Sequence, residues 1–402
     1  MASKASSAPM YRLNVLRVAG YRPFRQLNAP LGPLEVIVGA NGTGKSSLFE
    51  FLRFLRNAAH SEIPPEIVEG AIGQQIFHRG EADRFSWELE IDTDRSIPLI
   101  YSGELMGPVG ETRVTRESVK TKYPLSNEYD DPFVFMDITN RKGVVNEPGE
   151  GLKRQAFELQ RPNQLALSAM TNPKLGALYQ FREYVRGWRF YDSFRIDNAA
   201  IRRSVPIEQD PVLREDASNL SAVLFHLMTE HSQAFEELQT HLRGIIPGFK
   251  QIRVKARGGP GEVMAFWSEH GVNSELALSD LSDGILRLVC WVTLAVQPTP
   301  PPLVCIDEPG QGVHPRTLDT LAALFQRLAE RTQVVLATHS SYFLSRFDID
   351  QVAVMRKEQG ASQFLKPNRS DVLMHMLENF GTDELEALHR SDELEQLPET
   401  VS

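Results

Sequence analysis

The chain has 402 residues, of which 42% are hydrophobic and 24% charged, enough to bury one large α/β domain with an insertion, or two domains. Its formal net charge of −9 argues against a generally basic nucleic-acid-binding protein, although it leaves room for a local basic groove. The only two cysteines, Cys290 and Cys305, exclude a disulfide framework and a cysteine-based zinc site.

Neither the start of the chain nor its apolar stretches indicate export or membrane insertion. Residues 1–10 are rich in Ala and Ser and lack an apolar segment, which predicts a disordered start and not a signal peptide. The longest apolar stretch, 285–296, contains Arg287 and is too short to cross a bilayer. We therefore expect a cytoplasmic protein without membrane contact.

The N-terminal part predicts a strand, a glycine loop and a helix in direct succession. Residues 12–18 alternate partly, as in a strand, and residues 34–38 form a short apolar run that leads into the loop. Residues 47–57 repeat apolar side chains at helical spacing, and residues 85–91 alternate like a further strand.

The middle of the chain gives weaker signals. Between about residues 98 and 162, Gly, Pro and charged residues recur, which predicts an irregular, β-rich insertion. Helices are then expected over 165–185 and 218–242, and strands over 252–256 and 263–267 around a glycine-rich turn.

The last third returns to clear α/β patterning. Helices are expected over 281–296 and 317–328. Short apolar runs at 303–306, 334–337 and 351–355 predict buried strands.

The glycine loop carries the first chemical motif. Residues 39–46 match G-x-x-x-x-G-K-[ST] in the strand-to-helix context that a phosphate-binding loop requires. Gly42 and Gly44 allow backbone conformations in which N–H groups converge on phosphate oxygens, and the helix start adds positive charge. Lys45 would contact the β- and γ-phosphates, and the Ser46 hydroxyl would ligate Mg²⁺. The motif therefore predicts binding of ATP with Mg²⁺.

An acid pair after a buried strand is the second motif. Residues 303–306 are apolar and are followed by Asp307 and Glu308. Ligands of open α/β sheets bind at the carboxyl ends of the strands, where this pair would lie. We expect Asp307 to hold Mg²⁺ and Glu308 to act as the general base on the attacking water.

The third motif is weak evidence for a functional site by itself, and its position relative to the other motifs makes that evidence stronger. Leu281-Ser282-Asp283-Gly284 opens a predicted helix, where a Ser or Asp is an ordinary N-cap. Ser282, however, lies 25 residues before Asp307 (307 − 282), and His339 lies 32 residues after it (339 − 307), directly behind an apolar strand.

In this order the motifs resemble those of the ABC ATPase superfamily, and the details resemble its non-transporter branch, the RecF, SMC and OLD-type heads. Residues 15–24 are similar to the opening of those proteins, and residues 310–315 to their D-loop region. Residues 188–191 and 198–219 are similar to bacterial RecF-like ATPases grouped with the AAA family.

The resemblance implies a fold and its division. The fold would be α/β, a P-loop NTPase of ABC type with a mixed sheet, a β-rich first lobe and a helical signature lobe. The expected segments are a disordered 1–10, first lobe 11–100, an irregular β-rich and helical insertion 101–275, second lobe 276–366 and an acidic tail 367–402.

The resemblance also implies which residues hold the nucleotide. Lys45 would serve both binding and catalysis, and the signature residues Ser282 and Gly284 would contact the γ-phosphate from a second copy of the chain. The contacts within one copy would come from Gly39, Asn41, Gly42, Gly44, Lys45, Ser46 and Ser47.

Hydrolysis to ADP and phosphate would then take place in a homodimer with ATP sandwiched between the heads. His339 would hold the γ-phosphate beside Glu308. Mg²⁺ would be held by Ser46 and Asp307 and sensed by Gln74, with Gln75 the other candidate for that role.

Three departures narrow the resemblance. Position 311 is Gln where relatives often have Asn, which puts the fine D-loop contacts in doubt. Residues 98–275 show no heptads, so the head would lack a long coiled coil. After His339 only 63 residues remain (402 − 339), without the spaced acids of a nuclease domain.

The leading functional hypothesis is an ATP-gated dimer that acts on DNA in repair or anti-phage defence. A run of arginines favours it, although a solvated helix face explains that run equally well. Its members are Arg182, Arg186, Arg189, Arg195, Arg202 and Arg203.

The alternative hypothesis is a switch whose assembly with a separately encoded nuclease or toxin is set by ATP. The missing effector domain motivates it. A transporter subunit is disfavoured by the RecF-like N-terminus, and a GTPase by the lack of an N-K-x-D motif.

Overall fold

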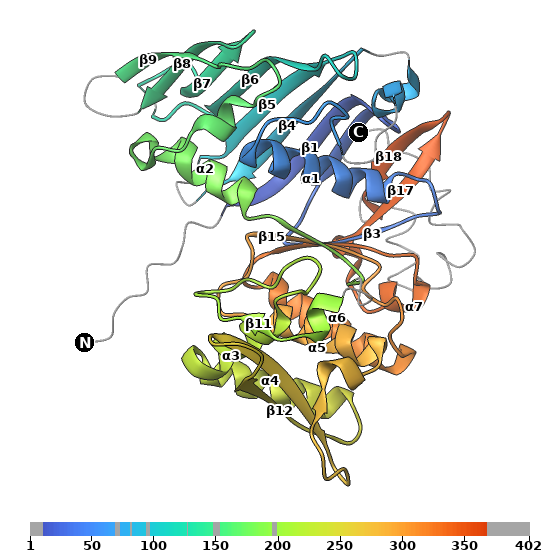
Figure 1. The fold of residues 1–402 in the computed structure, drawn as a ribbon. Coiled ribbons are helices and arrows are strands. Elements are labelled where there is room, and N and C mark those ends of the chain that lie inside the picture. Colours follow the sequence, from blue (N-terminus) through green and yellow to red (C-terminus); the bar gives the residue numbers. More distant parts are fainter. Residues whose placement is uncertain are drawn as a thin grey trace. The chain divides into compact units, whose positions relative to one another are not determined.

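The computed structural model describes residues 11–68, 73–80, 83–93, 97–126, 128–147, 153–194 and 199–367. These residues divide into two units, the first comprising 11–188 and 349–367 and the second 189–348 (Figure 1). The predicted disordered start and nearly all of the acidic tail lie outside the described residues.

An eight-stranded antiparallel sheet dominates the first unit. The segment expected to be irregular forms five of its strands, which pair in sequence order, with register shifts at Glu104/Leu105 and at Val119/Lys120. The spatial order is β2 (Phe24–Pro30), β1 (Arg12–Tyr21), β4 (Arg84–Asp92), β5 (Leu99–Met106), β6 (Arg113–Thr121), β7 (Val134–Thr139), β8 (Lys142–Glu147) and β9 (Lys153–Glu158).

Two helices, α1 (Lys45–His60) and α2 (Ala177–Arg186), lie across one face of this sheet (Figure 1). Phe54 of α1 meets Trp87 of β4 edge-on, with ring centroids 6.2 Å apart. Phe181 of α2 meets Tyr101 of β5 in the same way at 5.3 Å. Edge-to-face aromatic pairs each add about 0.5–1.5 kcal/mol beyond the burial of apolar area, so these rings fix the helices on the sheet.

A separate group of strands carries the glycine loop. β3 (Leu34–Val38) is buried at all five positions and pairs in parallel with β17 (Val352–Glu358). β18 (Ala361–Leu365), which the sequence patterns did not predict, pairs antiparallel with β17. The short helices η1 (Gly73–Ile76) and η2 (His78–Gly80) also belong to this unit.

Three short parallel strands form the centre of the second unit: β10 (Arg189–Asp192), β15 (Leu303–Asp307) and β16 (Gln333–Ala337). The packing helices include α5 (Asp283–Val296), whose Trp291 meets Phe325 of α6 (Leu318–Ala329) edge-on at 5.6 Å. The unit also contains the helices and strands α3 (Leu220–Glu230), α4 (Ser232–Ile245), α7 (Ser341–Leu344), β11 (Val205–Pro206), β12 (Phe249–Ala256), β13 (Glu262–Glu269) and β14 (Leu276–Ala277).

Two expected helices are shorter than their apolar patterns suggested. The helix predicted over 165–185 is broken around Pro173 and Gly176. Pro173 starts a single helical turn, and Gly176, with a φ of 48°, ends that turn directly before α2 begins. The helix predicted over 218–242 splits at His231, which has a φ of −134° between α3 and α4. Both strands predicted for 252–267 are confirmed as β12 and β13.

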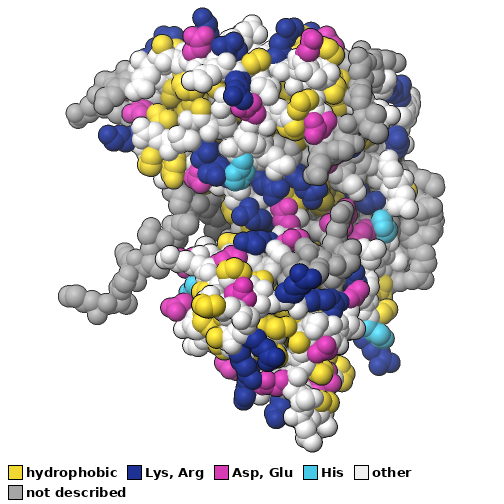
Figure 2. Space-filling view, in the orientation of Figure 1, with side chains coloured by type: hydrophobic (Ala, Val, Ile, Leu, Met, Phe, Trp, Pro, Cys, Tyr) yellow, Lys and Arg dark blue, Asp and Glu magenta, His cyan; other side chains and the backbone are white. Residues whose placement is uncertain are grey.

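Basic and acidic side chains are interspersed on the face shown in Figure 2. Arg17 pairs with Glu88 at 2.6 Å in the first unit, and Arg327 with Glu237 at 2.8 Å in the second. Such exposed pairs contribute little to stability, about 0–1 kcal/mol each. Among the described residues, no helix is long and apolar enough to cross a membrane.

A buried ion pair ties β3 to the end of the described chain. Glu35 is fully buried and lies 2.6 Å from the ammonium of Lys366, which also donates to the Asp350 carbonyl at 2.8 Å. Burial raises the pKa of Glu35 from 4.5 to about 7, while Lys366 acts to lower it. Because the folded-state pKa lies above the unfolded one, this carboxyl group makes the protein less stable as the pH rises from about 4.5 to about 7.

We expect Lys366→Met to destabilise the protein far more at pH 8 than at pH 5. At pH 8 the variant must bury an unpaired carboxylate, at a loss of about 3 kcal/mol, whereas at pH 5 Glu35 is protonated. Urea unfolding at the two pH values measures this difference. The double variant Glu35→Gln/Lys366→Met should recover most of the loss at pH 8. Equal losses at both pH values would show that Lys366 acts by packing alone.

Candidate nucleotide-binding and hydrolysis site

The glycine loop of the first unit leaves no room for side chains at two of its glycines. A Cβ on Gly39, whose φ is 150°, would lie 2.1 Å from the Met355 carbonyl of β17. Gly44 is the N-cap of α1 with a φ of 108°, and a Cβ there would meet Phe24 at 3.1 Å and the Ser362 hydroxyl at 2.8 Å. The loop can therefore follow this path only with glycine at these positions.

The donors of this loop fit a phosphate group. No side chain caps α1, which leaves its first N–H groups directed toward the loop. Lys45 is buried, and its ammonium donates to the carbonyls of Gly39 at 2.5 Å and Ala40 at 3.1 Å. Ser46 is exposed beside it, with a hydroxyl of the oxygen type that Mg²⁺ prefers.

The turn between β1 and β2 contacts both this loop and the segment with the two candidate glutamines. Phe24 packs at Gly44, and the Arg22 amide donates to the Ile76 carbonyl of η1 at 2.9 Å. Gln75 is exposed on η1, and the side chain of Gln74 lies outside the described residues. Either assignment of the magnesium-sensing glutamine stays a prediction.

In the second unit, the acid pair lies at the carboxyl ends of the parallel strands. The register aligns Asp307 with Asp192 of β10 and with Ala337 of β16. The next residue, Glu308, has a φ of 51°, and its amide donates to the Ala337 carbonyl at 2.9 Å. A left-handed backbone at a non-glycine residue stores about 1–3 kcal/mol of strain, a feature that clusters at functional sites.

Glu308 and His339 come together at this edge. His339 Nε2 lies 3.1 Å from Glu308 Oε1, and each residue follows the end of one of two neighbouring strands. The His339 side chain is half exposed, whereas that of Glu308 is mostly buried. The two residues predicted to act on the γ-phosphate and the attacking water are thus adjacent, at a distance that allows an ion pair when the imidazole is protonated.

The signature motif begins α5 as predicted. Ser282 is the N-cap, and its hydroxyl accepts from the Ile285 amide at 3.4 Å. Gly284 approaches the D-loop so closely that a Cβ there would lie 2.9 Å from the Gly312 carbonyl. Ser282 and Asp283 are exposed, which leaves this turn accessible to another molecule.

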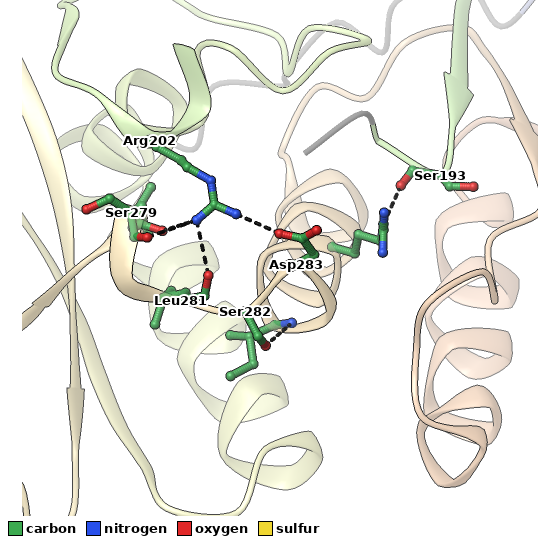
Figure 3. A network of polar contacts seen from close by, with 9 residues as sticks. Ser193, Arg202, Ser279, Leu281, Ser282 and Asp283 are labelled. Atoms are coloured by element: carbon green, nitrogen blue, oxygen red, sulfur yellow. Dashed lines mark hydrogen bonds and ion pairs between the residues drawn. The ribbon is translucent and has the colours of Figure 1, made fainter. Parts of the chain in front are cut away.

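Sequence reasoning missed a serine that connects α5 with the D-loop. Ser193 follows β10, and its hydroxyl donates to Gln311 Oε1 at 2.7 Å. Its carbonyl accepts from Arg287 of α5 at 2.9 Å, a contact drawn at Ser193 in Figure 3. Gln311, the departure from the usual Asn, is therefore engaged within its own chain.

Asp192 was also missed, although a signal was present in the sequence. It ends a short apolar strand, as Asp307 does, and the register places it directly beside Asp307. The sequence shows that an acid ends this short strand. It does not show that the strand pairs with the one that carries the predicted Mg²⁺ ligand, and only that pairing gives Asp192 its place.

These elements define a P-loop ATPase head of the ABC type, with a strand–glycine loop–helix unit and a signature helix beside an acid-ended strand. Residues 35–345 match the family described as AAA domain, putative AbiEii toxin, Type IV TA system. Because the match covers well over half of the chain, the protein belongs to that family.

Solved structures confirm the expected SMC- and RecF-like head fold. One is an Smc head bound to the C-winged helix domain of ScpA, with a TM-score of 0.55, 12% identity and coverage of 89% of this chain and 99% of that one. Another is the Smc head with an extended coiled coil bound to the C-terminal domain of ScpA, derived from Pyrococcus furiosus, with a TM-score of 0.50, 13% identity and coverage of 92% and 99%. At these identities the likeness shows the fold alone.

The predicted lack of a coiled-coil arm agrees with the described part of the chain, where the longest helix, α1, has 16 residues. A sequence search of the curated proteins finds no match.

We expect Gly284→Ala to lower the free energy of unfolding by about 1–3 kcal/mol, because the added methyl group must displace the Gly312 carbonyl. Gly244→Ala in α4 is the matched control, since nothing lies within 4 Å of a Cβ there. That control should be neutral or slightly stabilising, because alanine favours helix. Denaturant unfolding of both variants measures the effect. If the two variants had the same stability, the contact between α5 and the D-loop would be loose.

Proposed function

We propose that the protein hydrolyses ATP to ADP and phosphate at a site completed by a second copy of the chain. The observation that carries the proposal is the 3.1 Å approach of His339 to Glu308 at the carboxyl ends of β15 and β16. A carboxylate beside an imidazole, next to a further acid on the same strand, is the set of groups that polarises water and steadies a phosphoryl group. The family match to an AAA domain supports this reading.

The residues divide the work by their chemistry. Glu308 accepts a proton from the attacking water as general base, and His339 orients that carboxylate and donates to a γ-phosphate oxygen. Lys45 and the amides of the glycine loop hold the phosphates by charge and hydrogen bonds. Ser46 and Asp307 are the proposed Mg²⁺ ligands, and the metal would neutralise charge that develops on the phosphates.

The exposure of the signature turn supports the proposed pairing with a second copy. Ser282 and Asp283 face solvent at the start of α5, and the helix start offers N–H donors and positive charge to an anion. In the proposed dimer, Ser282 and Gly284 of each copy contact the nucleotide held by the glycine loop of the other. Turnover is then slow in a monomer, because each monomer carries only part of the site.

We expect Glu308→Gln to accumulate an ATP-bound dimer while turnover falls by about 100-fold or more. The amide keeps the size of the side chain but does not accept the proton from water. Light scattering with ATP and Mg²⁺ measures the mass, and phosphate release measures turnover. Adding Lys45→Ala to this variant should abolish ATP binding and leave a monomer. A Glu308→Gln protein that stays monomeric with saturating ATP contradicts the proposed pairing.

For the cellular role we propose action on DNA, in repair or anti-phage defence. Several members of the arginine run are already engaged within the chain: Arg182 is buried and bonds the Ser168 carbonyl at 3.0 Å, and Arg186 pairs with Glu183 at 2.9 Å. Arg202 is engaged in the second unit, and Arg195 lies outside the described residues. Acidic side chains also lie among the basic ones on the face in Figure 2, and the support for DNA therefore comes from the fold and not from this run.

The alternative is a switch that controls a separately encoded nuclease or toxin. Its support is the family description, which names a putative toxin and a toxin–antitoxin system. The heads in the similar solved structures are bound to domains of ScpA, which shows that this fold can carry a docked partner in those proteins. In this reading the ATP-driven dimer is the signal, and the partner carries the effector chemistry.

If the protein acts on DNA, its affinity for DNA should fall steeply as the salt concentration rises. Binding releases the cations that surround the DNA phosphates, and added salt opposes that release. Contacts to several phosphates predict a loss of about 10³-fold or more in affinity between about 50 and 200 mM salt. Fluorescence anisotropy with ATP and the Glu308→Gln protein measures this, beside ATPase rates with and without DNA. No binding at about 50 mM salt, together with recovery of one protein partner in a pull-down, would establish the switch instead.

A further inference from the structure

One arginine outside every motif reaches the main chain of the signature turn. Arg202 ends the short helix η5 (Ala199–Arg202), and its Nη1 lies 3.0 Å from the Ser279 carbonyl and 3.1 Å from the Leu281 carbonyl. The same nitrogen is 3.3 Å from the Leu278 carbonyl, and Nη2 lies 2.6 Å from Asp283 Oδ1 (Figure 3). The guanidinium group thus holds the chain on both sides of Ser282.

These contacts gather the carbonyls at the end of a short helix on one side chain. The carbonyls belong to η6 (Leu278–Asp280) and to the residue after it, and that of Leu278 also accepts from the Leu281 amide at 3.4 Å. A cation at a helix C-terminus and a carboxylate in the first turn of the next helix are both favourable to the helix dipoles. Nη1, which carries two hydrogens, serves the carbonyls while Nη2 serves Asp283, so the contacts use both ends of the planar guanidinium fork.

The ion pair also changes the charge that the turn presents. Asp283 lies between Ser282 and Gly284, the two residues proposed to contact a γ-phosphate, and a carboxylate there repels that anion. Its pair with Arg202 offsets the repulsion. The Arg202 side chain is 24% exposed and that of Asp283 60% exposed, so the pair faces the surface on which the nucleotide of a second copy would arrive.

We propose that Arg202 is a positioning residue for the signature motif: it fixes the main chain around Ser282 and neutralises Asp283, and so lets the turn close on a nucleotide held by a second copy. This inference rests on the proposed function, because it concerns the pairing of two heads. It assigns Arg202 no contact with the nucleotide itself.

The test compares ATP-driven dimerisation of Glu308→Gln alone and with a second substitution, by analytical ultracentrifugation at several protein concentrations. Arg202→Ala should weaken the ATP-bound dimer by about 10- to 100-fold, as expected for lost hydrogen bonds to a charged group. Affinity of the monomer for a fluorescent ATP analogue should change by less than about twofold, because the glycine loop is untouched. Arg203→Ala, at the exposed neighbouring position, is the matched control and should leave the dimer unchanged.

Two further variants separate charge from position. Arg202→Lys keeps the charge but not the fork, and should give a dimer of intermediate strength. Asp283→Asn added to Arg202→Ala should recover part of the lost affinity, because the unpaired carboxylate is removed.

The outcomes are distinguishable. If Glu308→Gln itself fails to dimerise with ATP, both the proposed function and this inference are wrong. If it dimerises and the Arg202 variants dimerise equally well, the inference alone is overturned. Equal losses of monomer nucleotide affinity and of dimer strength in Arg202→Lys would likewise overturn it, since they indicate a general structural role.

Discussion

The parallel register of β10, β15 and β16 is the constraint on which the second unit depends. It places Asp192, Asp307 and Ala337 in one row, so that the residue after each strand emerges at the same edge. Glu308 directly follows that row, where its amide still bonds the Ala337 carbonyl, and its left-handed backbone then turns the chain into the D-loop. The strain at Glu308 is therefore compensated by pairing within the sheet, which holds the carboxylate at a fixed place beside His339.

Contacts between backbone segments set much of the remaining geometry. Gly284 meets the Gly312 carbonyl, and Gly39 meets the Met355 carbonyl, at distances that exclude any side chain. In each case a loop proposed to contact phosphate rests directly on another element of the same unit. Ser193 adds a polar link between α5 and Gln311, so a displacement of the signature helix would also shift the D-loop. Rigid support of this kind is what a site built on loops requires.

How much could be predicted from the sequence follows from how local each feature is. The succession of β3, loop and α1, and the start of a helix at the signature motif, depend on neighbouring residues and were predicted correctly, with Ser282 one of two N-cap candidates. The approach of His339 to Glu308 was foreseeable because each follows a buried strand. The contacts of Arg202 were not foreseeable, since they join residues 76 to 81 positions apart in the sequence. The arginine run suggested a basic surface, but closeness in sequence does not determine burial, and the Arg182 side chain is buried.

The pairing of Glu35 with Lys366 has a consequence for biosynthesis. The two residues are 331 positions apart, and the strand that pairs with β3 also comes late in the chain. At translation rates of about 5–20 residues per second, a nascent chain carries β3 for tens of seconds before either partner leaves the ribosome. During that time its apolar run is unpaired and Glu35 has no counter-charge from Lys366. The phosphate-binding loop can therefore take its final shape only after the C-terminal strands have been synthesised, because Gly39 rests on the Met355 carbonyl of β17.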